Sequence, residues 1–235
     1  MSNFRPEIQR MFGYVPGEQT PAEKVIKLNT NENPYTCSAQ VVLAIESVLE
    51  NGLARYPDPT ALAFRQHAAG LLGVEPDWIM TGNGSDDILT IVTRAYAGQG
   101  DRVRIPYPSY VLYHTIAQIQ GASSEEVCFT DDWKLPPEFS EHADRLKLAY
   151  LPNPNSPSGT MIPPDQILEI SQQLPCPLLV DEAYVDFAET NCLGLLPKTD
   201  KILICRSFSK SYSLAGLRFG YVVAQPHVIE NLRKV

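Results

Sequence analysis

The residues most suited to chemistry lie in the run SFSKSYSLAGLRFG, which spans residues 207–220. Its lysine, Lys210, carries an amine that can form a Schiff base with an aldehyde. Ser207, Ser209 and Arg218 supply hydroxyl donors and a fixed positive charge, which suit a phosphate group. A lysine alone is usually a solvated surface charge. In this neighbourhood it predicts binding of pyridoxal 5'-phosphate (PLP), which carries both an aldehyde and a phosphate.

A carboxylate and a tyrosine form a second candidate group, in the sequence DEAY at residues 181–184. Asp181 follows three consecutive apolar residues, so it is either a helix cap or a buried ion that needs a partner. In a PLP site this carboxylate would hold the protonated pyridine nitrogen and keep the ring an electron sink. Tyr184, three residues later, would donate to the phenolic oxygen of the cofactor.

Two loops carry residues that suit the remaining parts of such a cofactor. Gly84, Ser85 and Asp86 begin a predicted helix, and the free N–H groups of a helix N-terminus bind anions such as phosphate. A plain glycine turn with a Ser or Asp cap is the alternative. Tyr110 lies in the turn PSY, where it could stack on a flat, electron-poor ring. Alternatively, it is a core aromatic in the first turn of a helix.

These motifs together resemble those of the fold-type I PLP-dependent aminotransferases, and within them the histidinol-phosphate aminotransferase group. The shared segments are SxSK followed by LAGLRxG, DEAY, and a GxGSDE segment in which Asp87 replaces the usual Glu. The resemblance implies that Lys210 binds the C4' carbon of the cofactor and that Tyr110 stacks on its ring. It also implies a set of phosphate-binding residues: Gly84, Ser85, Asp86, Ser207, Ser209 and Arg218.

Other matches to the family lie in loops and in the N-terminal arm. Tyr56 matches a tyrosine that reaches the phosphate of the neighbouring subunit's cofactor, which implies a homodimer; a loop aromatic packed on a helix is the alternative. Tyr14 and Asn31 resemble the family's substrate-side arm. In the loop NPNSPSG, the family position that contacts the phenolic oxygen is occupied by Ser156. The preceding residue, Asn155, could make that contact instead.

The resemblance further implies a reaction, the transamination of histidinol phosphate with 2-oxoglutarate in histidine biosynthesis. Lys210 would act as general base and general acid, with its pKa lowered by burial beside Arg218. An aromatic-amino-acid aminotransferase and a threonine-phosphate decarboxylase share these loops and are alternatives, as is a non-catalytic PLP-binding fragment. A nucleotide-binding Rossmann domain is disfavoured, because no third glycine follows Gly82 and Gly84 at the required spacing.

The elements that must position these residues follow from the apolar runs of the chain. Strands are predicted at residues 78–81, 102–105, 124–129, 146–151, 178–180, 201–205 and 221–224. Helical patterns between them imply an α/β fold, a three-layer α/β/α arrangement around a mostly parallel sheet. In such sheets ligands bind at the carboxyl ends of the strands, which is where the candidate motifs fall.

The predicted organisation is an N-terminal arm over residues 1–33 and a PLP-binding large domain over residues 34–235. A helix is predicted from His227, with no stop signal before Val235. Members of the resembled group continue beyond this point into a smaller C-terminal domain whose arginines bind substrate. We therefore expect weak or no turnover from these 235 residues alone.

Composition narrows the classes of partner. The formal net charge of −8 argues against nucleic acids and anionic membrane surfaces. Five widely spaced cysteines and four histidines show neither a disulfide framework nor metal-ligand spacing, so we expect no metal and a reducing, cytoplasmic setting. The N-terminus lacks the apolar core of a signal peptide, and no apolar run approaches the roughly 20 residues that span a bilayer.

Overall fold

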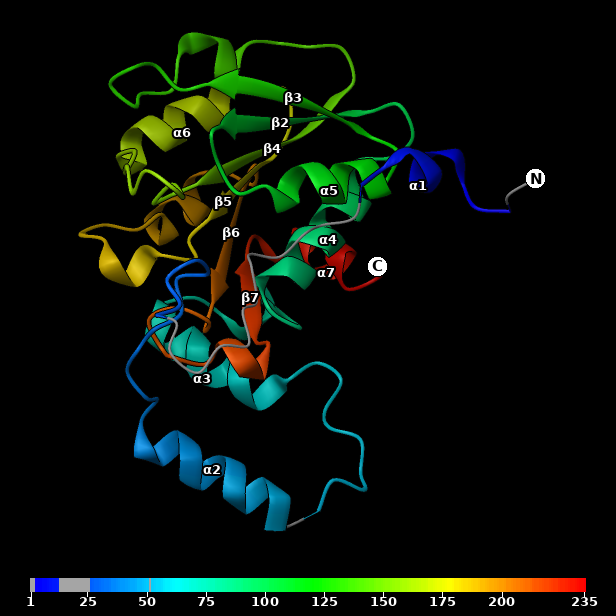
Figure 1. Ribbon diagram of the computed structural model, residues 1–235. Coiled ribbons are helices and arrows are strands. Elements are labelled where there is room, and N and C mark those ends of the chain that lie inside the picture. The colour runs from blue at the N-terminus through cyan, green and yellow to red at the C-terminus, as the bar shows by residue number, and fades with distance from the viewer. Residues whose placement is uncertain (1–2, 13–25, 51) are drawn as a thin grey trace.

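Seven strands of the described chain form a single sheet in the order β1-β7-β6-β5-β4-β2-β3 (Figure 1). The computed structural model describes residues 3–12, 26–50 and 52–235. The strand bounds are β1 Ile79–Gly82, β2 Arg102–Tyr107, β3 Ser123–Cys128, β4 Leu146–Pro152, β5 Leu178–Asp181, β6 Ile202–Ser207 and β7 Gly220–Val223. The seven strands given above are therefore present, with their ends shifted by two residues at most, whereas residues 26–28, part of a segment 25–28 that also suggested a short strand, form none.

Most neighbouring strands run in parallel. β2 pairs in this way with β3 and β4, and the parallel pairing continues from β4 through β5 to β6. β7 runs antiparallel to both β6 and β1, so β1 points in the same direction as the parallel strands. The predicted mostly parallel sheet is confirmed, and the carboxyl ends of all strands except β7 meet at one edge.

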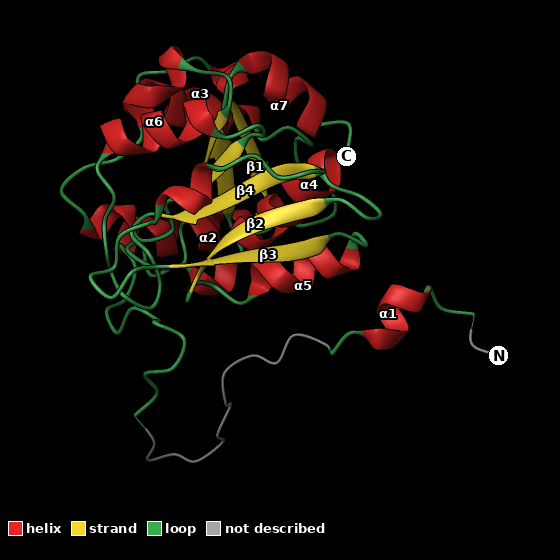
Figure 2. Cartoon of the chain, turned by 90° about the horizontal axis from the view of Figure 1, so that it is seen from above, coloured by secondary structure: helices red, strands yellow, loops and turns green. Residues whose placement is uncertain are grey.

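Helices cover both faces of this sheet, which confirms the three-layer arrangement (Figure 2). One face carries α3 (Leu62–Leu72) and α6 (Pro164–Gln173); the other carries α4 (Ser85–Tyr96), α5 (Leu112–Ile119) and α7 (Pro226–Leu232). Successive side chains of a strand point to opposite faces. In β6, Ile204 joins the core beneath α3 and α6, whereas Cys205 joins the core beneath α4 and α5. The strands are continuous apolar runs because both of their faces are buried.

The N-terminal part of the chain contributes little to this core. α2 (Ala39–Glu50) lies apart from the sheet and has no buried residue (Figure 1); its Leu43 side chain, for example, is 62% exposed. The sequence predicted an irregular arm, but the arm contains a short helix, α1 (Pro6–Arg10). A proline at the first helical position favours this start, and the neighbouring Arg5 donates to the carbonyl of Ile119 at the end of α5.

Short 3-10 helices complete the described chain. Their bounds are Pro76–Trp78, Pro137–Ser140, Val185–Phe187, Leu193–Lys198 and Ala215–Leu217. The final helix, α7, ends at Leu232, whereas the sequence indicated that it would continue to Val235. None of the helices that the structure describes combines the length and the apolar character needed to cross a membrane.

Candidate active site

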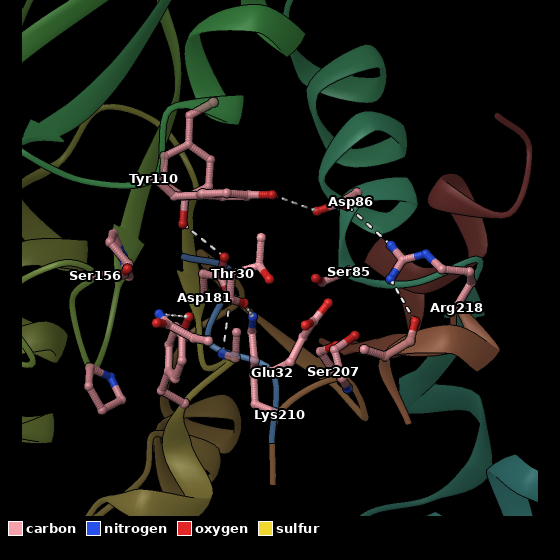
Figure 3. A pocket seen from close by; sticks show the side chains of 18 of the residues that line it. Thr30, Glu32, Ser85, Asp86, Tyr110, Ser156, Asp181, Ser207, Lys210 and Arg218 are labelled. Carbon is pink, nitrogen blue, oxygen red and sulfur yellow. Dashed lines mark hydrogen bonds and ion pairs between the residues drawn. The ribbon is translucent and has the colours of Figure 1, made fainter. Parts of the chain in front are cut away.

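A cavity of about 420 Å³ lies at the edge of the sheet where the parallel strands end (Figure 3). The strand register explains why it forms there. Asp181 pairs with the last residue of β4, Pro152, and Ser207 pairs with the first residue of β7, Gly220. Many of the predicted residues line it: Asn31, Ser85, Asp86, Tyr110, Ser156, Asp181, Tyr184, Ser207, Ser209, Lys210 and Arg218.

Lys210 points into this cavity from the loop that follows β6. Its Nζ donates to the main-chain oxygen of Thr30 at 2.8 Å and lies 5.5 Å from the centre of the Tyr184 ring. Asn33 fixes the loop by donating to the main-chain oxygens of Lys210 and Ser211, both at 3.2 Å. The segment around Thr30 therefore approaches the lysine directly, although the two residues are far apart in the sequence.

Asp181 is a buried carboxylate at the end of β5, with both oxygens engaged. Oδ2 accepts a hydrogen bond from the Tyr113 hydroxyl at 2.8 Å, and Oδ1 accepts one from the Ala183 N–H at 3.0 Å. Burial raises the pKa of Asp181 to about 6, although the two hydrogen bonds act in the opposite direction. The sequence left Asp181 as either a helix cap or a buried ion. In the structure it is a buried carboxylate that also accepts the Ala183 N–H in the turn that follows.

Two glycines allow close contacts at one end of the cavity. A Cβ atom on Gly84 would lie 2.6 Å from Nη2 of Arg218, and one on Gly220 would lie 2.5 Å from the main-chain nitrogen of Ser85. Gly84 also has a positive φ of 86°, which favours glycine. Nη2 of Arg218 pairs with Oδ2 of Asp86 at 3.1 Å. The guanidinium thus lies close to the start of α4, and the free N–H groups of a helix N-terminus can bind an anion.

Hydroxyl groups surround this positively charged end. The Ser207 hydroxyl donates to the Ser209 hydroxyl at 2.9 Å, and its oxygen accepts from the Ser209 N–H at 3.1 Å. Tyr110 donates to Oδ1 of Asp86 at 3.3 Å, and its ring meets the Tyr113 ring edge to face, with centres 5.6 Å apart. Tyr110 is half-buried and lines the cavity.

Asn155 and Ser156, the two alternatives for contacting the phenolic oxygen, have different positions in the loop after β4. Ser156 lines the main cavity, whereas Asn155 is buried behind it. The Asn155 amide donates to the Ser158 hydroxyl at 2.8 Å and to the main-chain oxygen of Pro108 at 3.3 Å. Asn155 also borders an adjoining hollow of about 300 Å³, together with Tyr184. The structure therefore places Ser156, and not Asn155, against the main cavity.

The remaining predicted residues have different positions. The Asn31 side chain donates to the Tyr184 hydroxyl at 3.0 Å, so it joins the cavity wall. Tyr56 is 100% exposed in the loop between α2 and α3, so it is not packed on a helix, and it does not line the cavity. Tyr14 lies outside the described residues. Among the described residues no cluster of three or more His, Cys, Asp or Glu side chains could hold a metal ion.

Two participants were not found by reading the sequence. Tyr113 lies in the first turn of α5, three residues after Tyr110, and no pattern in the sequence relates it to Asp181. Thr30 contributes a main-chain oxygen, for which side-chain patterns give no signal. Behind the cavity, Glu182 is also buried: its carboxylate accepts from Nε of Arg206 at 2.8 Å and from the Cys192 N–H at 2.6 Å.

Comparison with known proteins gives a consistent result. Residues 23–235 match the family model described as aminotransferase class I and II. The histidinol-phosphate aminotransferase of Rhodopirellula baltica is 56% identical over 233 residues, which are 99% of this chain and 64% of that protein. The histidinol-phosphate aminotransferase 1 of Trichormus variabilis is 43% identical, over 99% of this chain and 66% of that protein. The chain thus spans slightly less than two thirds of these relatives.

Among solved structures, the histidinol-phosphate aminotransferase from Sinorhizobium meliloti in complex with pyridoxal-5'-phosphate has a TM-score of 0.87. It is 27% identical to this chain, and the match covers 100% of this chain and 66% of that one. A histidinol-phosphate aminotransferase named as putative, from Erwinia carotovora atroseptica, has a TM-score of 0.80 at 28% identity, over 87% of this chain and 62% of that one.

Proposed function

The chain belongs to the class I and II aminotransferase family, and on that premise we propose that its cavity binds PLP for amino-group transfer. One observation carries the proposal. A single cavity of about 420 Å³ brings together the Lys210 amine, the buried Asp181 carboxylate and the cationic, hydroxyl-rich end at Arg218. A cavity of this size suits a small cofactor, and its few polar groups suit the two ends of PLP.

The donor set fits PLP at both ends of the cofactor. The hydrogen-bond donors of Asp181, the Tyr113 hydroxyl and the Ala183 N–H, are neutral. A protonated pyridine nitrogen would supply the positive charge that a buried carboxylate needs. At the other end, Arg218, the serine hydroxyls and the N–H groups at the start of α4 suit a phosphate.

Each residue then has a defined task. When bound, PLP supplies an aldehyde carbon for the amine and a ring that withdraws electrons from the substrate's α-carbon. Lys210 Nζ would hold the aldehyde carbon of the cofactor, and its amine would serve as general base for the proton of the α-carbon and as general acid toward that cofactor carbon. Asp181 would keep the ring nitrogen protonated. Tyr184 and Ser156 would donate hydrogen bonds to the phenolic oxygen, and Tyr110 would cover one face of the ring.

For the substrates, we propose histidinol phosphate as amino donor and 2-oxoglutarate as acceptor. The support is the 56% identity to the Rhodopirellula baltica protein named histidinol-phosphate aminotransferase. The chain spans 64% of that relative, so weak or no turnover by these 235 residues alone remains our expectation. An aromatic-amino-acid aminotransferase, a threonine-phosphate decarboxylase and a PLP-binding chain without turnover are outcomes that a substrate panel separates.

We also propose that a homodimer completes the site, with Tyr56 of each subunit reaching the cofactor phosphate of its partner. Tyr56 is fully exposed, and it follows α2, a helix with exposed apolar side chains and no buried residue. Contiguous exposed apolar surface is typical of an interaction site. Sedimentation velocity over a range of concentrations tests the dimer, and loss of PLP affinity in Tyr56→Ala at concentrations that favour the dimer tests the shared phosphate contact.

The absorption spectrum of the chain titrated with PLP tests the cofactor proposal. We expect a visible band that requires Lys210 and is absent in Lys210→Ala. Lys134→Ala is the matched control, because Lys134 is an exposed lysine paired with Asp132 at 2.5 Å, so surface amines that react with PLP are accounted for. A band of equal strength in Lys210→Ala would contradict the proposal. Bleaching on addition of histidinol phosphate, but not of tyrosine or threonine phosphate, would favour the named substrate.

A further inference from the structure

A tyrosine outside the predicted set contacts the central carboxylate of the cavity. Tyr113, from α5, is completely buried, and its hydroxyl lies 2.8 Å from Oδ2 of Asp181. The two residues are 68 positions apart in the sequence. Their contact exists because α5 packs on the same face of the sheet toward which Asp181 points. The other carboxylate oxygen is held by the Ala183 N–H, so neither oxygen can turn freely.

The direction of this hydrogen bond is determined by the burial of both groups. Burial, followed by the nearby Asp181 charge, raises the pKa of Tyr113 well above its ordinary value. Tyr113 therefore stays protonated and donates, and the carboxylate accepts. A hydrogen bond donated to the charged form of an acid stabilises that form, and in a buried site it is stronger than a bond between neutral groups.

The Tyr113 ring is itself held in place. It stacks on the ring of Tyr150 in β4, with centres 4.4 Å apart and planes inclined by 11°. The Tyr150 hydroxyl contacts Thr93 and lies 3.3 Å from the main-chain oxygen of Leu89, both in α4. The two tyrosines thus connect α5, β4 and α4 beneath the cavity. This stack gives the Tyr113 hydroxyl a single position, directed at Asp181.

The other charged or titratable groups near Asp181 do not stabilise its charge in the same way. Asp86 from α4 and Glu182, the next residue along the chain, both raise the pKa of Asp181. The Cys205 thiol in β6 is neutral because burial raises its pKa well above the ordinary value. Lys210 shares the cavity, but its Nζ is bonded to Thr30. Among these side chains, Tyr113 is the one whose hydrogen bond favours the ionised carboxylate.

We propose that Tyr113 is a positioning residue that fixes the orientation of Asp181 and keeps it ionised to receive the cationic ring nitrogen of PLP. This inference rests on the proposed function, since it assigns Tyr113 a role in the same cofactor site. Tyr113 acts through Asp181 and does not itself need to touch the cofactor. The role depends on its hydroxyl, whereas the ring supplies packing.

The test compares Tyr113→Phe with Tyr150→Phe, which removes a hydroxyl at the same depth from the other ring of the stack. The first readout is the carboxyl pKa of Asp181 in the cofactor-free chain, followed by carbon NMR of labelled aspartate and assigned with Asp181→Asn. We expect Tyr113→Phe to raise this pKa by about one unit and Tyr150→Phe to leave it nearly unchanged. Thermal unfolding of both variants checks that each is folded.

The second readout is the dissociation constant of PLP. Tyr113→Phe should weaken binding about fivefold at pH 6, where a carboxyl pKa raised by about one unit leaves much less of Asp181 ionised, and this loss should disappear in the Asp181→Asn background, because the two residues act together. Equal effects of the two tyrosine variants, or a loss that persists without Asp181, would overturn the inference in favour of simple packing. A chain that binds no PLP in any form overturns the proposed function itself, and the carboxyl pKa then still decides whether Tyr113 controls Asp181.

Discussion

Two adjacent carboxylates at the end of β5, Asp181 and Glu182, are both buried, at 6% and 1% exposure, but their surroundings differ. Glu182 lies on the side of α3 and α6 and forms an ion pair with Arg206, whose Nη2 is 2.7 Å away. Asp181 lies on the side of α4 and α5, where its hydrogen-bond donors are neutral. One charge is therefore neutralised within the fold, and the other is stabilised only in part.

The difference separates a structural charge, Glu182, from Asp181, for which we propose a functional role. A buried ion is costly unless it is paired, so folding alone favours the arrangement of Glu182. The pKa of Asp181 is raised to about 6 because burying its charge at the cavity is only partly offset by its hydrogen bonds. A residue with a strongly perturbed pKa in a cavity is a candidate for function. A cation would compensate this charge, and the protonated pyridine nitrogen of the proposed cofactor is such a cation.

Of the changes that test the contrast between the two carboxylates, Glu182→Gln is expected to have the largest effect on stability. The change would leave the partly buried Arg206 guanidinium without its counter-ion and should lower the free energy of unfolding by about 3 kcal/mol. Urea unfolding monitored by fluorescence measures it. Asp132→Asn breaks an exposed pair with Lys134 and should have no measurable effect. If Glu182→Gln lost as little stability as Asp132→Asn, the Glu182–Arg206 ion pair would contribute no more to folding than an exposed ion pair.

The opposite behaviour is expected from Asp181→Asn in the cofactor-free chain. Because the folded pKa is about 6 and the ordinary value is 3.8, ionised Asp181 opposes folding above pH 6 and has no such effect below pH 4. The free energy of unfolding of the native chain relative to Asp181→Asn should therefore fall by up to about 3 kcal/mol as the pH rises from 4 to 7.

Urea unfolding at a series of pH values in this window measures that difference. Adding saturating PLP should remove it, since a cationic partner stabilises the ionised form. A difference that is independent of pH would contradict the view that the charge of Asp181 is uncompensated.

A smaller effect is expected from Gly84→Ala, which alters the cavity without touching the Glu182 side. The φ of 86° and the guanidinium 2.6 Å from the new Cβ should together cost about 1–2 kcal/mol and weaken phosphate binding at the start of α4. Gly70→Ala is the matched control, because Gly70 lies inside α3 with open space around it and should gain up to about 1 kcal/mol. Thermal unfolding measures the change in stability, and PLP titration measures the change in cofactor affinity. Equal stability of the two variants would argue against backbone strain at Gly84.

The smallest effect on the fold is expected from Leu43→Ser in α2. Leu43 is exposed, so the free energy of unfolding of the monomer should change by less than about 0.5 kcal/mol. If α2 lies in the proposed dimer interface, the same change should weaken self-association measured by sedimentation. Unchanged association would place the dimer interface elsewhere and leave the exposed apolar face of α2 without this role.

Much of the fold could be predicted because its signals are local. Apolar runs such as residues 146–151 and 178–180 mark strands that are buried on both faces, and their ends follow from the loop residues beside them. The cofactor-type residues around Lys210 and Asp181 could be named for the same reason, since each lies in a short motif next to a strand end. The sequence could not show that Tyr56 is fully exposed or that α1 forms within the arm.

The tertiary structure alone decided which distant groups meet. Tyr113 reaches Asp181 because its ring stacks on Tyr150 of β4, the strand next to β5, and the Thr30 oxygen meets Lys210 because residues 29–32 line the same cavity. Ser156 faces the ligand space, whereas Asn155 is bonded within its own loop. The sequence by itself determined the types of chemical group and the strand ends that carry them, because these depend on neighbouring residues. Which donor meets which acceptor depends on the packing of elements far apart in the chain, and that packing has no local signature.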